Sequence, residues 1–528
     1  MLWLGVGLVG LLLIFWLASV ARRGAPTWPV ADGALIEIYT MHASRGDQLL
    51  GAYSQYGWYH PGPLLFYLLA PFYLLGGRTL YGLDLGALVI NLSSLLLIAS
   101  ILGRRRSMAP MTATLLLIGL FGYFVRLPDL LTSAWNPHIS VWPFAALLVC
   151  TAATVDGSPR LLPVVVLLAS LVTQTHVGFT AVALALGALA LAAVLASGLF
   201  LRERRPVIVV AILASIVVLQ LIWLPVFADE LSGRPGNLTK IWRFFFETSE
   251  TQTVDAALRA WSSMLMGIVR PSLTVAIGIG FSGSSRTSFL IAGIASVVVL
   301  PFAAFARWRS GHRFEAILAA VCFTASAIGF WSVLHIRGLI GDYQLFWLSV
   351  LGVFNLAISA GFLIGLADRG RWTARMSPRL VATAALLFAV CAVGVGAGHE
   401  VLATRAGNLP DENESVRRLT GDMRQTLTSM GAHRPLFRIQ GADWGIGVGL
   451  MLQLARAGVP FGADADFANR FDRNLAPNGK EDVLVTLSGL DEHQQLAMRA
   501  GNVTLAESNW RVRLFVDAVS LVDHPEYR

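Results

Sequence analysis

The sequence has few charged residues and few cysteines, and each scarcity excludes a class of protein. Only 14% of the 528 residues are Asp, Glu, Lys or Arg, whereas soluble domains carry about 25%. Hydrophobic residues make up 55%, which indicates a polytopic membrane protein. The three cysteines, Cys150, Cys322 and Cys391, all lie in hydrophobic runs. They exclude a disulfide framework and a cysteine-based zinc site.

Common catalytic motifs are also absent. The sequence contains no P-loop, no Ser-His-Asp signature, no H-E-x-x-H, no EF-hand loop and no C-x-x-C. It has no internal repeat of the kind that many transporters show. The net charge of +8 is almost wholly due to arginine, because Lys240 and Lys480 are the only lysines. In a membrane protein this balance indicates basic cytoplasmic loops and no nucleic-acid partner.

Eleven hydrophobic runs are long enough to cross a bilayer as helices. The predicted spans are 2–20, 83–102, 110–125, 139–155, 160–175, 177–199, 207–227, 287–306, 314–334, 344–366 and 379–397. The first lacks the basic start of a signal peptide, so we expect an uncleaved anchor. Two further runs, 63–76 and 264–283, are short or interrupted, and we expect them to be interfacial or re-entrant.

The distribution of arginine predicts which loops share a side of the membrane. Basic clusters follow every second span, at 104–106, 202–205, 307–313 and 368–375, with 156–160 at the equivalent position after span four. The positive-inside rule assigns these loops to the cytoplasm. The chain is then expected to be a multi-pass protein of the cytoplasmic (inner) membrane. Its amino terminus lies in the cytoplasm and its carboxyl terminus lies outside. Three loops, 21–82, 126–138 and 228–286, lie on the outer side.

The carboxyl-terminal segment 398–528 differs in character from the transmembrane domain 1–397. Short β-rich runs at 436–439, 483–486 and 512–516 flank a helical stretch at 444–457, which Gly458 is expected to end. We predict a small extracytoplasmic α/β domain. Its glycines at 445, 447 and 449 lack the G-x-G-x-x-G spacing, so we interpret them as a turn and tight helix packing.

The first outer loop contains the leading candidate for catalysis. Asp32 opens the segment 33–41, which is expected to be an amphipathic helix. Asp32 is either the N-cap of this helix or a general base. Glu37 would point about 140° away from it on a helix, as a substrate contact or as a brace for the loop. His60, in His60-Pro-Gly-Pro63, either hydrogen-bonds a phosphate, ligates a metal ion or is an ordinary interfacial histidine beside an aromatic belt.

Four further candidates fall on the outer side. Asp129 and His138 belong to the second outer loop. Asp129 is either a cap or turn residue or a second acid that holds Asp32 in place, shares a metal ion with it or contacts the acceptor, and His138 is a candidate substrate contact. His176 lies at the edge of a span, where polar groups usually face a bundle interior or a cavity. Arg337 is the predicted phosphate contact, because a guanidinium binds phosphate with forked geometry.

The order of these residues resembles the GT-C superfamily of membrane glycosyltransferases, which includes bacterial aminoarabinose transferases and protein O-mannosyltransferases. The matching positions are Asp32, His60-Pro61 and Asp129, and the resemblance covers about residues 1–200. Many relatives have two adjacent acids where this chain has Asp32-Gly33, which leaves the second acid unassigned. The resemblance implies an all-α polytopic bundle with a small α/β domain.

The resemblance also implies an activity. A sugar would move from a polyprenyl-phosphate donor in the membrane lipid to a glycan, lipid or protein acceptor, with inversion. Asp32 would act as the base, with Asp129 nearby. Some relatives use a divalent metal ion and others do not, so that cofactor stays open. Three other functions also remain open. They are a lipid or polysaccharide flippase or transporter, an undecaprenyl-diphosphate glycan polymerase or ligase, and a non-catalytic scaffold whose carboxyl-terminal domain binds a partner.

Overall fold

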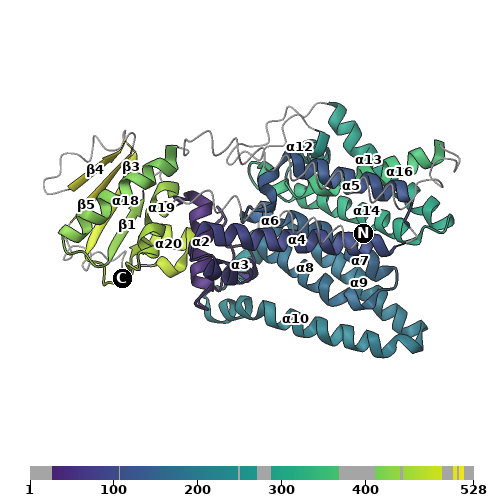
Figure 1. Cartoon of the computed structure of the whole chain (residues 1–528), viewed down its shortest axis with the longest axis horizontal. Helices are drawn as coiled ribbons and strands as arrows, with labels where there is room; N and C mark the ends of the chain where they lie inside the picture. The colour runs from purple at the N-terminus through teal and green to yellow at the C-terminus, as the bar shows by residue number, and fades with distance from the viewer. Residues whose placement is uncertain are drawn as a thin grey trace. The chain divides into compact units, whose positions relative to one another are not determined.

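The structure is a computed structural model of the chain (Figure 1). It describes residues 27–105, 108–247, 250–269, 287–367, 411–439, 444–489, 503–507 and 510–515. The described residues form two compact units. The helical unit contains residues 87–367, and the mixed unit joins residues 27–86 to 411–515. The predicted spans 2–20 and 379–397, and most of 264–283, lie outside the described residues.

The helical unit consists of long apolar helices joined by short turns. Its elements are most of α4 (Leu80–Arg104), α5 (Pro110–Arg126), η1 (Pro128–Leu131), α6 (Asn136–Ile139), α7 (Val141–Val155), η2 (Pro159–Leu161), α8 (Leu162–Thr175), η3 (Val177–Phe179), α9 (Thr180–Phe200), η4 (Arg202–Arg204), α10 (Arg205–Ser232), α11 (Asn237–Phe246), α12 (Val254–Leu265), η5 (Gly267–Val269), α13 (Thr287–Arg309), α14 (Arg313–Leu334), α15 (Asp342–Leu345) and α16 (Leu348–Ala367). All nine predicted spans between 83 and 366 are helical here. Seven helices of the described chain are long and apolar enough to cross a membrane. The prediction of a polytopic membrane bundle is confirmed.

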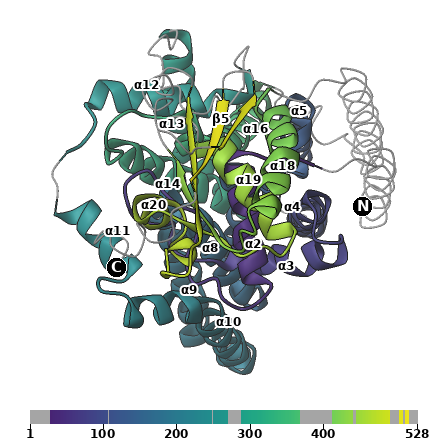
Figure 2. The same cartoon turned by 90° about the vertical axis from the view of Figure 1, so that its left-hand side faces the viewer.

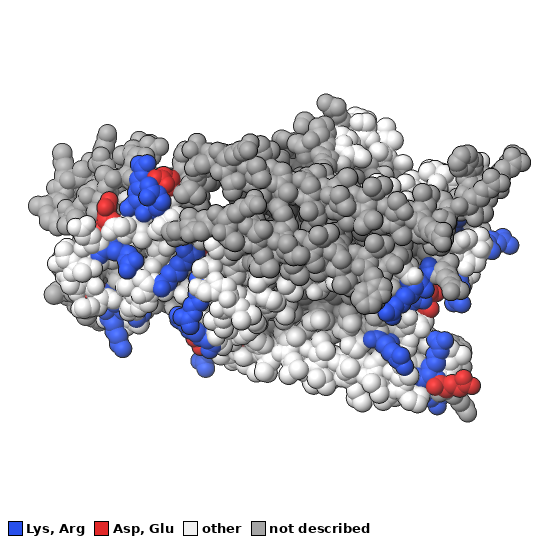
Figure 3. All heavy atoms as spheres, in the orientation of Figure 1, with Lys and Arg blue, Asp and Glu red and all other residues white. Residues whose placement is uncertain are grey.

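Helix α10 presents apolar side chains to its surroundings. Val210, Leu221 and Leu224 are each about two-thirds exposed. Figure 3 shows a largely uncharged surface along this helix, with charged side chains gathered at its start over η4. Such an exposed apolar stripe is unfavourable in water and favourable against lipid hydrocarbon.

Polar contacts bring three of the predicted basic loops together at one end of the helical unit. The Arg105 guanidinium donates to Asp156 at 2.6 Å and to the Ser158 hydroxyl at 2.7 Å. The Arg204 guanidinium reaches the carbonyl oxygen of Gly157 at 3.4 Å. The loops after spans two, four and six therefore share one end, as the charge pattern predicts. The side of the membrane that this end faces stays a prediction.

The predicted outer loops of the same unit also contact one another. The Asn136 amide donates to the carbonyl oxygen of Thr175 at 3.5 Å. The Gln252 amide donates to the carbonyl oxygens of Ile336 and Gly338 at 2.8 and 2.7 Å. Segments that are far apart in the sequence therefore meet where their helices end.

The mixed unit combines helices from the first outer loop with a five-stranded sheet. Its elements are α2 (Ala31–Ala43), α3 (Leu64–Leu75), the first turns of α4, α18 (Asp411–Ser429), β1 (Pro435–Ile439), α19 (Trp444–Arg456), β2 (Gly462–Ala463), α20 (Ala465–Phe471), η8 (Arg473–Leu475), β3 (Val483–Gly489), β4 (Val503–Glu507) and β5 (Trp510–Phe515). The strand order is β2-β1-β3-β5-β4. Strands β2, β1 and β3 are parallel, and β5 is antiparallel to both β3 and β4.

The predicted strands and the predicted helix of the carboxyl-terminal segment are all present. Helices α18 and α19 lie side by side along the sheet (Figure 2). Gly458 follows α19 with a φ of +72°, the left-handed conformation in which glycine ends helices. The small α/β domain is therefore confirmed as a fold, and the structure adds that residues 27–86 pack with it as one unit.

The two helices of the first outer loop differ in how well the sequence predicts them. The prediction of an amphipathic helix at 33–41 is wrong, since α2 is buried on nearly every side, packed between α3 and α19. Helix α3 has 12 residues, about 18 Å at 1.5 Å per residue. It is too short to cross a hydrocarbon core of about 30 Å. Its exclusion from the spans is supported.

Candidate functional site

Asp32 lies in the first turn of α2. The N-cap of this helix is Val30, which is extended, and Ala31 adopts a left-handed φ of +47°. The interpretation of Asp32 as the N-cap is therefore wrong, because the helix begins one residue before it. Its carboxylate is half-buried and accepts a hydrogen bond of 2.9 Å from the Tyr53 hydroxyl. A carboxylate in a first helical turn is also favoured by the helix dipole.

An aromatic cluster holds the tyrosine that contacts Asp32. The Tyr53 ring packs against Phe471 at 4.6 Å and edge-on against Trp444 at 5.8 Å. Trp444 in turn stacks on Phe471, with ring centroids 5.0 Å apart and planes only 15° from parallel. Two of the three rings come from the carboxyl-terminal domain, so that domain fixes the phenol beside Asp32.

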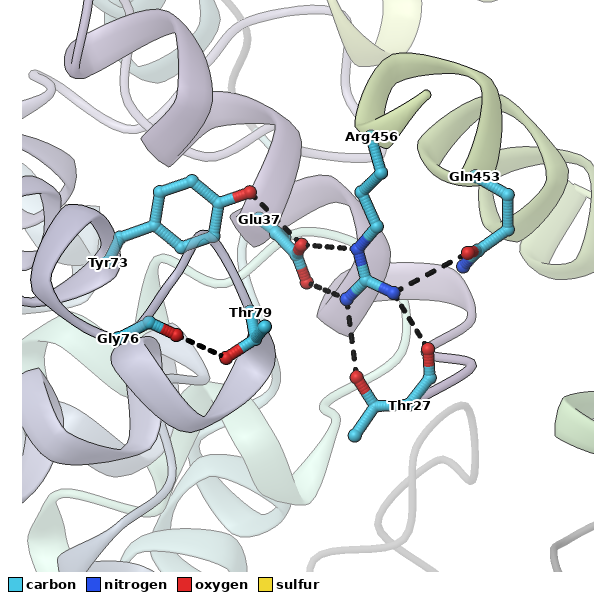
Figure 4. Close-up of polar contacts among 7 residues, drawn as sticks. All are labelled: Thr27, Glu37, Tyr73, Gly76, Thr79, Gln453 and Arg456. Carbon is cyan, nitrogen blue, oxygen red and sulfur yellow. Dashed lines mark hydrogen bonds and ion pairs between the residues drawn. The ribbon is translucent and has the colours of Figure 1, made fainter. Parts of the chain in front are cut away.

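Glu37 is completely buried and bonded at both carboxylate oxygens (Figure 4). The Arg456 guanidinium donates from Nε and Nη2 to the two oxygens, each at 2.7 Å, and the Tyr73 hydroxyl donates at 3.2 Å. Burial raises the pKa of Glu37, and the hydrogen bonds from Arg456 and Tyr73 offset part of that rise. These contacts correspond to the bracing role that the sequence left open. Since Asp32 is helical, Glu37 points to another face of α2, as predicted.

His60 belongs to a loop that folds back on itself. Its side chain is 7% exposed, and its backbone N–H donates to the carbonyl oxygen of Ala52 at 2.7 Å. A Cβ on Gly51 would lie 2.4 Å from the His60 carbonyl oxygen, so only glycine permits this approach. The aromatic belt predicted around it is wrong for Trp58 and Tyr59, which are buried inside the unit.

In the helical unit, His138 and His176 occupy neighbouring loops. Nδ1 of His138 lies 3.0 Å from the Ser133 hydroxyl, and its ring lies 5.3 Å from that of Phe346. Nδ1 of His176 accepts from the backbone N–H of Gly178 at 3.2 Å, which caps η3. Their two segments are joined by the bond between Asn136 and Thr175.

Asp129 and Arg337 complete the predicted set. The backbone of Asp129 lies in η1, and its side chain lies outside the described residues. The Arg337 guanidinium lies 4.2 Å from the centre of the Phe244 ring, a cation–π contact between a loop and α11. Gln252 bonds the backbone on both sides of Arg337 and so fixes this loop.

The predicted residues therefore fall into two groups. Asp32, Glu37 and His60 belong to the mixed unit, and Asp129, His138, His176 and Arg337 belong to the helical unit. Arg456 and Trp444 were not predicted. Their signals are weak, since each is a single residue at one end of an apolar helical stretch. Within the described residues, no three His, Cys, Asp or Glu side chains are placed to hold a metal ion.

Comparison with known proteins identifies the fold. No protein-family model matches the sequence, and no curated protein matches it. Two crystal structures of ArnT from Cupriavidus metallidurans are similar to it along nearly the whole chain. The apo structure is 15% identical with a TM-score of 0.53, covering 98% of each chain. The structure bound to undecaprenyl phosphate is 14% identical with a TM-score of 0.50, covering 98% of this chain and 99% of that one. The chain therefore has the fold of ArnT, and the predicted architecture of a polytopic helical bundle with a small α/β domain is confirmed.

Proposed function

We propose that this chain is a membrane glycosyltransferase that moves a sugar from a polyprenyl-phosphate donor to a glycan, lipid or protein acceptor. One observation carries the proposal, namely that the likeness to ArnT extends over 98% of the chain. One of those ArnT structures holds undecaprenyl phosphate. The seven apolar helices of the described chain are long enough to cross the bilayer in which such a donor would be dissolved. We further propose that transfer occurs at the outer face of the cytoplasmic membrane.

Asp32 is the proposed general base. It would take the proton of an acceptor hydroxyl, whose oxygen then attacks the anomeric carbon of the donor sugar. The bond from that carbon to the phosphate oxygen breaks, the electron pair leaves with the lipid phosphate, and the anomeric centre is inverted. Three features support this role: the half-buried carboxylate, its hydrogen bond from Tyr53, and its place in a first helical turn.

The remaining predicted residues receive supporting roles. His60 and Arg337 are the proposed contacts of the phosphate, where positive charge and hydrogen-bond donors would stabilise the charge that develops on the leaving group. His138, His176 and Asp129 of the helical unit are proposed to contact the acceptor. Glu37 has both of its oxygens engaged by protein groups, so we assign it a positioning role in place of the substrate contact.

A transfer assay with a matched pair of variants tests the proposal. The full-length protein in lipid nanodiscs is incubated with radiolabelled undecaprenyl-phosphate-linked monosaccharides and bacterial membrane extract as the acceptor source. Asp32→Asn should lower transfer by about 10³-fold or more while the thermal midpoint is kept, because a base is lost without change of volume. Asp47→Asn is the control, since Asp47 lies in the same outer segment but is exposed.

Each alternative function predicts a different result. Unchanged transfer in Asp32→Asn would remove Asp32 as the base. Movement of the labelled lipid across the bilayer, without sugar transfer by the wild-type protein, would favour a flippase. Consumption of undecaprenyl-diphosphate glycans, with no use of the monophosphate donors, would favour a polymerase or ligase.

A further inference from the structure

Helix α19 of the carboxyl-terminal domain lies directly against the turn that starts α2. A Cβ on Gly449 would lie 3.0 Å from the carbonyl oxygen of Pro29, and one on Gly445 would lie 3.3 Å from the Cβ of Ala31. These two glycines are four residues apart and so share one face of the helix. Their lack of side chains allows α19 to reach the backbone immediately before Asp32.

The carbonyl groups of the same segment are held by side chains from that domain. The Arg456 guanidinium donates to the carbonyl oxygen of Thr27 at 2.7 Å. The Asn413 amide on α18 donates to the carbonyl oxygen of Trp28 at 2.7 Å. The backbone that enters α2 is thus fixed at consecutive residues by two different helices.

Arg456 also fixes the middle of α2 through Glu37. Its paired hydrogen bonds to the Glu37 carboxylate are both 2.7 Å long and fully shielded from solvent on the Glu37 side. A fork of two parallel bonds restrains rotation as well as distance. Asp32 lies five residues earlier on the same helix, about 7.5 Å along its axis. A rigid helix held at its start and at Glu37 leaves the Asp32 backbone one position.

We infer that Arg456 is a positioning residue for Asp32, and that the carboxyl-terminal domain is therefore required for the reaction and not only attached to it. This inference rests on the proposed transferase function and on Asp32 as its base. Arg456 does not touch the substrate. It acts by holding α2 so that the Asp32 carboxylate meets the acceptor hydroxyl, and displacement by about 1 Å at such a group can cost about 10²-fold in rate.

The test removes the paired hydrogen bonds between Arg456 and Glu37 and keeps the positive charge at position 456. Arg456→Lys retains a cation beside Glu37 but cannot make two parallel bonds. Arg417→Lys is the matched control, because Arg417 makes the same kind of paired contact to Glu414 on the exposed surface of α18. Steady-state rates, donor KM and hydrogen exchange of peptides covering 27–43 are measured on the full-length protein in nanodiscs.

The expected result is a split between kcat and KM. Arg456→Lys should lower kcat at least tenfold, leave the donor KM within about twofold and speed amide exchange in 27–43, while Arg417→Lys changes none of these. A Cβ on Gly449 would meet Val416 Cγ2 on α18 at 2.7 Å as well as the Pro29 carbonyl oxygen at 3.0 Å. Gly449→Ala therefore displaces α19 from its neighbours with all charges intact, and it should show the same pattern if Arg456→Lys does not fold. Gly421→Ala is its control, since a Cβ there meets nothing within 4 Å.

Two outcomes would overturn the inference alone, and a third would be a failure of the proposed function. A normal kcat in Arg456→Lys with Asp32→Asn inactive would leave the transferase intact and remove the positioning role. Faster exchange in 27–43 with unchanged kcat would reduce Arg456 to a structural brace. Absence of transfer by the wild-type protein would remove both proposals together.

Discussion

The hydroxyl of Tyr53 donates a hydrogen bond of 2.9 Å to the carboxylate of Asp32, 21 residues earlier in the chain. The ring behind this hydroxyl is fixed by contacts with Phe471 and Trp444. The donor is therefore preorganised, and it limits how the Asp32 carboxylate can turn. If Asp32 is the base, the Tyr53 phenol helps to orient its carboxylate.

Removal of this hydroxyl should lower the rate of transfer. Tyr53→Phe keeps the ring and its packing but deletes the donor, and a hydrogen bond to a charged group contributes about 1.5–3 kcal/mol. We expect a kcat that is about tenfold lower with a near-normal thermal midpoint, since about 1.4 kcal/mol corresponds to a factor of ten. Steady-state transfer kinetics measure this change.

Tyr67→Phe is the matched control for that experiment. The Tyr67 hydroxyl also makes a bond of 2.9 Å, but to the backbone oxygen of Gln48. Its loss should leave kcat within about twofold, because no proposed catalytic group is touched. Equal effects of the two substitutions would indicate that the phenols act only on stability.

In the helical unit, Glu315 should be critical for stability. It has no exposed side-chain surface and forms an ion pair with Arg307 at 3.2 Å. It also accepts from the Thr112 hydroxyl at 2.6 Å and from the backbone N–H of Ala109 at 3.0 Å. Glu315→Ala would leave Arg307 without its counter-charge, a loss of about 3–5 kcal/mol. The thermal midpoint in nanodiscs should fall by several degrees, whereas Glu203→Ala, at an exposed site in η4, should not change it.

The helices of the helical unit could be predicted from sequence because lipid leaves few alternatives. A segment in hydrocarbon must satisfy its backbone hydrogen bonds internally, so long apolar runs become helices whatever their neighbours. Charge alternation likewise predicted that Arg105 and Asp156 lie at the same end. Local rules were less reliable where the backbone is unusual. Ala31, with its φ of +47°, starts α2 early and moves Asp32 from the expected N-cap into the helix.

The partners of the candidate site could not be predicted in the same way. Glu37 and Arg456 are separated by 419 residues, and no periodicity in the sequence connects two such positions. Their meeting depends on how α19 packs against α2, and that packing depends on glycines in α19. The sequence indicates that these glycines allow close helix packing, but it does not show which surface they contact. The side-chain types needed for the candidate site can be recognised in the sequence, while tertiary packing decides which of them pair.

Asp472 should make stability depend on pH. It is 2% exposed, and among the described residues its Oδ2 has no hydrogen-bond partner. Burial raises its pKa, with His42 and the Asn474 backbone acting in the opposite sense. Because the folded pKa exceeds the unfolded one, the folded state holds the proton more tightly. Stability is therefore lost as the pH rises from the ordinary carboxyl range through the folded pKa.

Asp472→Asn should remove this loss. The amide oxygen can still accept from the Asn474 backbone N–H, now 3.0 Å from Oδ1. We expect the thermal midpoint of the full chain at pH 7.5 to rise by about 2–4 °C for each kcal/mol recovered, with the gain shrinking toward pH 4. Asp422→Asn, at an exposed site on α18, is the control. A gain that is equal at both pH values would contradict the assignment.

Gly51 should tolerate no side chain, because the loop of His60 closes on it. A Cβ at Gly51 would lie 2.4 Å from the His60 carbonyl oxygen and 2.8 Å from that of Gly62, and both are backbone atoms that cannot rotate away. Gly51→Ala should therefore open the loop and speed amide exchange in 51–63. It should also lower the rate of sugar transfer, because His60 would be displaced.

Gly33→Ala is the control, since the nearest atom to its new Cβ would be at an ordinary contact distance of 3.7 Å. Within a helix, alanine there should raise stability by about 0.5–1 kcal/mol. Normal exchange in 51–63 for Gly51→Ala would show that the loop is not held by this contact, and His60 would then need another anchor.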